Sequence, residues 1–279
     1  MNSICINGKF VKEDEPVLLA SNRGYRYGDG LFETMKVLDG RILLESYHFD
    51  RLFAGLELLR FSLPQQFSVK LLTAKILELC EKNKCTSLAR VRLSISRGNG
   101  GLYDGDNRIT YIIECWPLSN TVNEINSNGL IVGTFPVARK SCDKFSEIKS
   151  ASCLPYVMAA QFAKENKWND CILLNTEEKI ADTTIANVFL IKDGVISTPA
   201  AGQGCIMGVM RRHLLNVLPQ AGYGINEAAI SVSDLLQADE VFLTNAVRGV
   251  QWVQQFETKT YSSIVTAEIY SRFVKTIFY

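Results

Sequence analysis

The sequence is poor in the residue types that metal sites and disulfide frameworks require. Only two histidines occur among 279 residues, and none of the eight cysteines belongs to a Cys-x-x-Cys pair. A structural zinc site needs four converging ligands, so we expect no metal site. Most of the cysteines lie in apolar segments, where a reduced thiol packs as a small core residue.

Long apolar runs are also missing, because no stretch approaches the about 20 residues that span a bilayer. The first residues lack the basic segment followed by an apolar one that is typical of a signal peptide. No charge of one sign dominates, since 30 basic residues face 29 acidic ones and leave a formal net charge of +1. We therefore expect a cytoplasmic protein that binds neither nucleic acid nor a membrane.

The composition that remains is that of a globular protein, 47% hydrophobic and 21% charged. Apolar residues at helical spacing predict helices over 47–59, 69–80, 155–166, 209–218 and 266–277. Runs rich in β-branched residues predict strands over 3–7, 31–38, 41–44, 88–96, 109–115, 130–135, 171–175, 187–191 and 240–244. These elements indicate an α+β (mixed α/β) fold.

A polar stretch over 117–128 carries no periodicity and is the best candidate for a linker. It predicts an N-terminal α/β domain over 1–119, a linker over 120–129 and a C-terminal domain over 130–279.

Lys149 precedes a run of small residues and then Pro155, which suits the first turn of a helix. Small neighbours leave room beside the ammonium for a planar group. A lysine that reacts with a carbonyl must be partly desolvated, because the neutral amine is the nucleophile. Most loop lysines are simply solvated, and Lys140 and Lys144 fit that interpretation.

Asp182 stands just before the strand over 187–191. An anionic side chain at this position could keep a pyridine nitrogen protonated, which makes the ring an electron sink. The alternative is a turn aspartate that bonds its own backbone.

Two further segments could bind phosphate. A glycine-bearing loop over 202–212 opens a helix, and backbone N–H groups at a helix N-terminus bind anions. The alternative is an ordinary loop-to-helix junction, and no Walker A lysine follows. Arg51 lies on the polar side of the helix over 47–59, where it either clamps a phosphate or is a surface charge.

Together these pieces resemble the class IV aminotransferase family, also called PLP fold type IV, whose two-domain fold is D-amino acid aminotransferase-like. The matching stretches run in the family's order and spacing over nearly the whole chain. They are 22–34, 48–52, Lys149 with its helix, 182–189, 208–211 and 243–253. The resemblance implies the cofactor pyridoxal 5′-phosphate (PLP), a small-molecule amino substrate and a homodimer.

The resemblance also implies roles for individual residues. Lys149 would carry PLP as a Schiff base and shuttle the proton. Asp182 would pair with the ring nitrogen, where the family usually has glutamate. The implied cofactor-binding residues are Arg51, Lys149, Asp182, Asn187, Val209, Met210, Asn245 and Ala246. Two departures are Ser152-Cys153, where the family often has Asn-Tyr, and Met210, where many members have threonine.

The family divides into branched-chain aminotransferases, D-amino acid aminotransferases and 4-amino-4-deoxychorismate lyases, and the fold does not decide among them. The segments 96–103, 208–211 and 236–246 are similar to the lyase's versions. The resemblance therefore favours a lyase that forms p-aminobenzoate and pyruvate in folate synthesis, with Arg97 and Tyr27 at the substrate. A branched-chain or D-amino acid aminotransferase is the first alternative, and a PLP-binding protein without turnover is the second.

Overall fold

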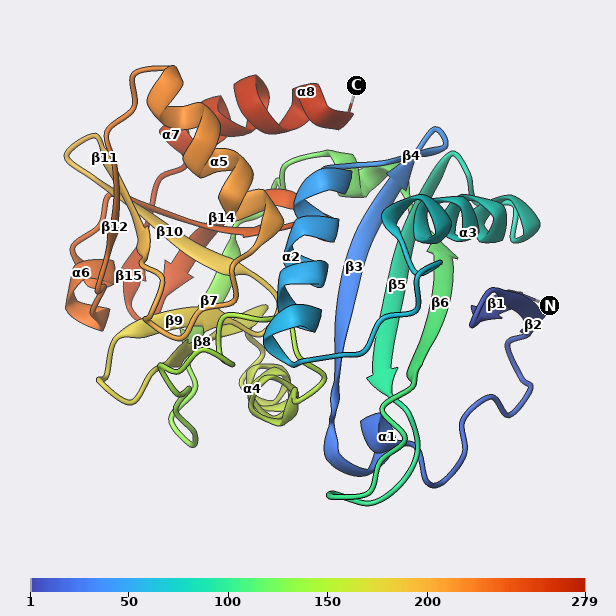
Figure 1. Cartoon of the computed structure of the whole chain (residues 1–279). Helices are drawn as coiled ribbons and strands as arrows, with labels where there is room; N and C mark the ends of the chain where they lie inside the picture. The colour runs from blue at the N-terminus through green and yellow to red at the C-terminus, as the bar shows by residue number, and fades with distance from the viewer. Residues whose placement is uncertain (1, 279) are drawn as a thin grey trace. The chain divides into compact units, whose positions relative to one another are not determined.

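In the computed structural model, which describes residues 2–278, the chain forms the expected mixed α+β fold (Figure 1). The described chain divides into two compact units. The first unit holds the chain up to Asn120 together with Lys149–Ser152, and the second holds Thr121–Ile148 and the chain from Cys153 onward. The segment that contains Lys149 thus contacts the first unit, although its position in the sequence lies within the predicted C-terminal domain.

The first unit is built on an antiparallel sheet in the order β2-β1-β6-β5-β3-β4. Its strands are β1 Ser3–Ile6, β2 Lys9–Lys12, β3 Gly30–Leu38, β4 Arg41–Ile42, β5 Leu88–Arg97 and β6 Ile109–Pro117. The helices are α1 Arg23–Tyr27, α2 Glu45–Leu58 and α3 Val69–Lys82. Helix α2 packs on β3, and α3 packs on β6 and β1 (Figure 1).

The hairpin between β3 and β4 turns at Asp39 and Gly40, which both have positive φ angles, 47° and 71°. This is the conformation that an Asp-Gly pair adopts most readily in a two-residue hairpin turn. The turn leads the chain into α2, whose apolar face is buried against the sheet through Phe49, Leu52 and Leu56. The sequence therefore places the start of α2 beside β3.

The second unit is built on a larger sheet in the order β12-β11-β10-β13-β14-β7-β8-β9, with β15 paired to β14. Its strands are β7 Leu130–Thr134, β8 Asp170–Leu174, β9 Ile180–Thr183, β10 Asn187–Lys192, β11 Val195–Pro199, β12 Ile225–Ala228, β13 Glu240–Asn245, β14 Gly249–Phe256 and β15 Lys259–Thr260. Its helical elements are η1 Asn120–Asn123, α4 Leu154–Glu165, α5 Val209–Gln220, α6 Val232–Leu236, α7 Ile264–Ile269, the π-helical turn η2 Tyr270–Val274 and α8 Lys275–Phe278. Helix α4 packs on β8, and both α5 and α7 pack on β13.

The expected helices and strands all occur, with shifted ends, but the structure adds several elements that the sequence patterns did not predict. The expected helix over 266–277 is interrupted by η2. Strand β9 is one of these added elements, because its sequence Ile-Ala-Asp-Thr is too short and too polar to indicate a strand. All four of its residues are nevertheless buried.

Apolar side chains fill the interior of the second unit, including Val132, Ile172, Val188, Val241 and Val253. They come from neighbouring strands of the sheet, which explains why these strands are near-continuous apolar runs. No helix within residues 2–278 is long and apolar enough to cross a membrane.

Candidate active site

Lys149 is held in the first unit by backbone hydrogen bonds to the start of β3. The Lys149 carbonyl accepts from the amide of Phe32 at 3.0 Å, and the Ala151 amide donates to the Gly30 carbonyl at 2.8 Å. The Lys149 ammonium lies 4.4 Å from the centroid of the Phe32 ring. A half-buried ammonium against an aromatic ring is partly desolvated, as a nucleophilic lysine must be.

A buried carboxylate on β3 organises the same unit. Arg51 Nε donates to Glu33 Oε1 at 2.8 Å, and Arg51 Nη2 donates to Glu33 Oε2 at 2.6 Å. His48 Nδ1 lies 2.7 Å from Glu33 Oε2, and it carries the hydrogen because a carboxylate can only accept. The Arg51 side chain is 13% exposed, so its interpretation as a surface charge is wrong.

The protonation states of this cluster follow from burial and charge. Burial alone would raise the pKa of Glu33, but the charges and hydrogen bonds of Arg51 and His48 lower it to about 2. Burial lowers the pKa of His48, and the nearby positive charges of Arg51 and Lys149 lower it further against the attraction of Glu33. Glu33 is therefore a carboxylate and His48 a neutral imidazole around neutral pH.

In the second unit, three donors converge on one oxygen of Asp182. Lys140 Nζ and the Tyr156 hydroxyl each donate to Asp182 Oδ2 at 2.9 Å, and the Ile206 amide donates to it at 3.0 Å. Lys140 Nζ also contacts the Tyr156 hydroxyl. Burial, with the charge of Asp182 beside it, raises the pKa of Tyr156, which keeps this phenol a donor.

This network corrects two interpretations of the sequence. Lys140 is not a solvated loop lysine, because it is 8% exposed and paired with Asp182. Asp182 is not a turn residue bonded to its own backbone, because its three donors are at least 24 residues away. The second oxygen, Asp182 Oδ1, is buried without a hydrogen-bond partner among the described residues. A buried acceptor of this kind is costly unless a ligand satisfies it.

The glycine-bearing loop before α5 is tied to the same network. The Ile206 amide bonds Asp182, and the Ile206 carbonyl accepts from Asn187 Nδ2 at 2.7 Å. Gly208 caps α5 without a side-chain hydrogen bond, and a Cβ there would meet Asn187 Oδ1 at 2.0 Å. Val209 and Met210 follow as the first two helical residues, whose amides are of the kind that helix geometry leaves without intrahelical partners.

The predicted Asn245-Ala246 turn lies at the end of β13. Asn245 Oδ1 accepts from the amides of Val247 and Arg248 at 3.0 and 2.8 Å, so this side chain shapes the turn. Thr244 precedes it with a buried hydroxyl oxygen that has no partner within residues 2–278. The phosphate roles of Asn245, Ala246, Val209, Met210 and Arg51 stay predictions.

The two predicted substrate residues lie in the first unit. Arg97 Nε donates to Asp29, Nη1 donates to Asn107 and the Arg60 carbonyl, and Nη2 donates to the Leu59 carbonyl. These bonds use most of the Arg97 donors, so in this structure the guanidinium mainly holds neighbouring segments of the first unit together. Tyr27 ends α1 with a half-exposed ring, 5.5 Å from the Arg23 guanidinium.

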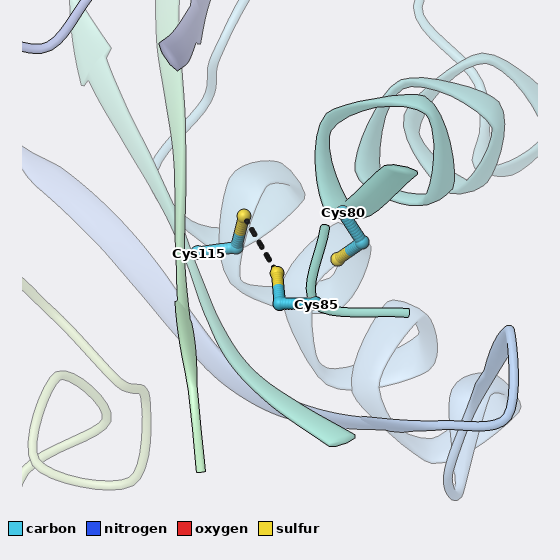
Figure 2. A group of neighbouring side chains, drawn as sticks. All are labelled: Cys80, Cys85 and Cys115. Carbon is cyan, nitrogen blue, oxygen red and sulfur yellow. Dashed lines mark hydrogen bonds between the residues drawn. The ribbon is translucent and has the colours of Figure 1, made fainter. Parts of the chain in front are cut away.

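Three buried thiols form a separate cluster in the first unit. Figure 2 shows Cys85 and Cys115 directed toward one another, and Cys80 beside them. Their sulfur atoms lie within 4.8 Å of one another, and the Cys85 thiol donates to Cys115 at 3.5 Å. Hydrogen bonds from Cys80, Asn83 and Cys85 lower the pKa of Cys115 to about 6. Three sulfur ligands fall short of the four in a structural zinc site, and the absence of a metal stays a prediction.

Sequence reasoning missed the partners that position the expected residues, namely Glu33, His48, Lys140 and Tyr156. Glu33 and His48 lie inside stretches that match the family pattern, so the sequence could have marked both residues, but it could not show that they contact one another. Lys140 and Tyr156 carried no local signal, because a lysine in a polar stretch and a tyrosine on a helix are both common on surfaces.

The family model of amino-transferase class IV matches residues 30–256. Among relatives, the chain is 26% identical over 270 residues to a putative branched-chain-amino-acid aminotransferase of Methanocaldococcus jannaschii, covering 95% of this chain and 92% of that protein. It is 28% identical over 232 residues to an aminodeoxychorismate lyase of Vibrio harveyi, covering 82% and 83%.

A solved structure of similar fold is the branched-chain aminotransferase of Thermoproteus uzoniensis. It superposes with a TM-score of 0.89 at 18% identity, and the match covers 99% of this chain and 95% of that one. At this identity the likeness establishes the fold and leaves the reaction open.

Proposed function

Because the chain belongs to the class IV aminotransferase family, whose members are PLP enzymes, we propose that it is a lyase that converts 4-amino-4-deoxychorismate to p-aminobenzoate and pyruvate. The reaction would serve folate synthesis. The PLP dependence follows from the family, and the choice of the lyase reaction is the proposal.

The described residues fit PLP. When bound, PLP supplies an electron sink that stabilises negative charge at the substrate's α-carbon. Asp182 Oδ1 is a buried acceptor without a partner in the described chain, which is what a protonated ring nitrogen requires. Gly208 is the N-cap of α5, where a Cβ would meet Asn187 Oδ1, and the helix start that follows would face the phosphate. Asp182 is shorter than the family's glutamate but supplies the same charge.

The residues of the first unit would perform the proton chemistry. Lys149 would hold the cofactor and, once the substrate amine displaces it, would take the α-proton on Nζ. Loss of that proton, together with cleavage of the neighbouring ring carbon–oxygen bond, would make the substrate ring aromatic and release the side chain as enolpyruvate. Return of a proton to its carbon would give pyruvate, and Lys149 would then displace the amine of p-aminobenzoate. The bidentate pair with Glu33 fixes the Arg51 guanidinium in one orientation, so that it can bind a phosphate without rearranging.

The observation that supports the lyase is the ordered, hydrogen-bonded loop between β5 and β6. The loop resembles the lyase's Ser-Arg-Gly-x-Gly-Gly segment, and hydrogen bonds hold it in shape. Asp106 Oδ1 accepts from the Asn99 amide at 3.1 Å, and Asp104 Oδ1 accepts from the Gly101 amide at 2.9 Å. Gly100 has a φ of 124°, which other residues rarely adopt. The glycine pattern is therefore a structural requirement here and not a loose hairpin tip.

The test is release of p-aminobenzoate from 4-amino-4-deoxychorismate by the purified holoenzyme, with no keto acid added. We expect release that is lost in Lys149→Ala and retained in Lys144→Ala, since Lys144 is an exposed lysine of the same region. A holoenzyme with intact cofactor absorbance that releases no p-aminobenzoate would overturn the lyase proposal. Borohydride trapping of the cofactor that survives in Lys149→Ala would overturn the role of Lys149.

Transamination is the second candidate function. It is favoured by the relative from Methanocaldococcus jannaschii, which matches more of the chain than the lyase relative does. In a transaminase, Lys149 would pass the α-proton to the cofactor carbon, whereas in the lyase that carbon would gain no proton. Half-reactions with branched-chain L-amino acids and with D-amino acids distinguish the two, because only a transaminase leaves the cofactor in its amine form.

A further inference from the structure

The carboxylate of Asp182 is asymmetric in its contacts. Oδ2 accepts from Lys140, Tyr156 and the Ile206 amide, at 2.9, 2.9 and 3.0 Å. Oδ1 of the same group is buried without a partner among residues 2–278. The Lys140 and Asp182 side chains are 8% and 3% exposed, so water screens neither charge well. The contacts on Oδ2 fix the carboxylate and leave Oδ1 as its remaining acceptor.

We propose that Lys140 is a positioning residue that holds Asp182 for the PLP ring nitrogen and makes that nitrogen less basic than a lone carboxylate would. The inference rests on the role of Asp182 in the proposed function, but not on which reaction follows. It also gives a purpose to a buried lysine that neither the proton chemistry nor the phosphate requires.

The physical argument concerns two opposite charges near one ring nitrogen. A carboxylate stabilises a pyridinium and so raises the pKa of the nitrogen. The Lys140 ammonium, bonded to that carboxylate, repels the pyridinium and lowers the pKa again. In a poorly screened interior both effects persist over several ångströms. Asp182 and Lys140 together therefore set an intermediate basicity, and removal of Lys140 should raise the pKa of the ring nitrogen.

A purely structural ion pair would behave differently. Buried pairs are often no more stabilising than apolar residues, although breaking one leaves an uncompensated charge. If Lys140 only neutralised Asp182, its loss would lower the stability of the protein and leave the protonation of bound PLP unchanged. The protonation of the ring nitrogen thus separates the two roles.

The experiment uses holoenzyme reconstituted with PLP that carries 15N at the ring nitrogen. The 15N chemical shift is followed against pH without substrate in the wild type, Lys140→Met, Lys140→Arg and Tyr156→Phe. Lys144→Met is the matched control, because it removes an exposed lysine from the same stretch. We expect the pKa of the ring nitrogen to rise by about one pH unit or more in Lys140→Met. Lys140→Arg and the Lys144→Met control should match the wild type, and Tyr156→Phe should give a smaller rise.

A ring-nitrogen titration in Lys140→Met that coincides with the wild type would overturn the inference. Where Lys140→Met does not fold, Lys140→Gln replaces it, since the amide can still donate to Asp182 without the charge. Asp182→Asn tests whether Asp182 contacts the ring nitrogen at all, independently of the effect of Lys140. If it leaves the titration unchanged, the assignment of Asp182 itself is wrong. A lyase assay that fails while the Lys140 effect appears would overturn only the proposed reaction.

Discussion

Glu33→Gln is expected to remove a large part of the acid sensitivity of the first unit. Glu33 has its pKa lowered from 4.5 to about 2, so the folded state binds its proton less readily than the unfolded chain does. The ionised group therefore stabilises the protein fully above about 4.5, and this stabilisation is lost as the pH falls toward about 2. The gap is about 2.5 pH units, which at about 1.4 kcal/mol per unit amounts to about 3.5 kcal/mol.

The assay is urea unfolding of the apoprotein over this pH range, for the wild type and Glu33→Gln. The difference in unfolding free energy should narrow by about 1.4 kcal/mol for each pH unit below 4.5. His48 also contributes, because burial lowers its pKa below the ordinary 6.5, so the unfolded chain binds this proton more readily and stability falls as the pH drops below about 6.5. Repeating both measurements in a His48→Gln background cancels that contribution.

The structure supplies a matched control in Arg139 and Glu178. Their bidentate geometry is like that of Arg51 and Glu33, with distances of 2.7 and 2.9 Å, but Glu178 is exposed. Surface pairs contribute little, so Glu178→Gln should change the pH dependence far less. A flat difference between the wild type and Glu33→Gln, or one no larger than for Glu178→Gln, would refute the argument that burial gives this pair its strength.

The other predictions concern the second unit, the substrate loop and the assembly. Gly208→Ala places a Cβ 2.0 Å from Asn187 Oδ1. We expect the dissociation constant for PLP to rise at least tenfold in a spectroscopic titration of the apoprotein, which corresponds to a loss of about 1.4 kcal/mol of binding free energy. Thr266→Val removes a 2.7 Å bond to the buried carboxylate of Glu240 and should cost about 1–3 kcal/mol in urea unfolding, without altering cofactor absorbance. Arg97→Lys should lower thermal stability because it removes bonds to two backbone carbonyls, and an accompanying rise in substrate KM would support its predicted contact with a carboxylate. Sedimentation equilibrium of the holoenzyme should give a dimer, and a monomer at assay concentrations would contradict that expectation.

Much of the fold could be predicted because its signals are local. The apolar faces of α2 and α3 recur at helical spacing, and the Asp39-Gly40 pair marks its hairpin. Strand β9 was not predictable on these grounds, since Asp182 interrupts a four-residue strand. Its burial is stabilised by donors from distant segments, namely Lys140, Tyr156 and the Ile206 amide.

The roles of Lys149 and Asp182 stay predictions, but the sequence singled out both residues, whereas it did not indicate the partners that the structure places beside the candidate residues. Lys149 and Asp182 follow the order and spacing of a family pattern. Lys140 lies 42 residues before Asp182, and Glu33 lies 18 residues before Arg51. Pairing across such separations depends on tertiary structure, and a polar stretch that holds both a buried Lys140 and an exposed Lys144 offers no local distinction between them.

The two buried carboxylates of Glu33 and Asp182 differ in how completely the described chain satisfies their oxygens. Glu33 has both oxygens engaged, by Arg51 and by His48, and gains nothing from a further donor. Asp182 has three donors on one oxygen and none from the described chain on the other. An unmet buried acceptor destabilises the protein by about 1–3 kcal/mol. In the proposed function a ring nitrogen would donate to Asp182 Oδ1 and relieve this cost, so part of the affinity for PLP would be set by the way Lys140 and Tyr156 occupy the other oxygen.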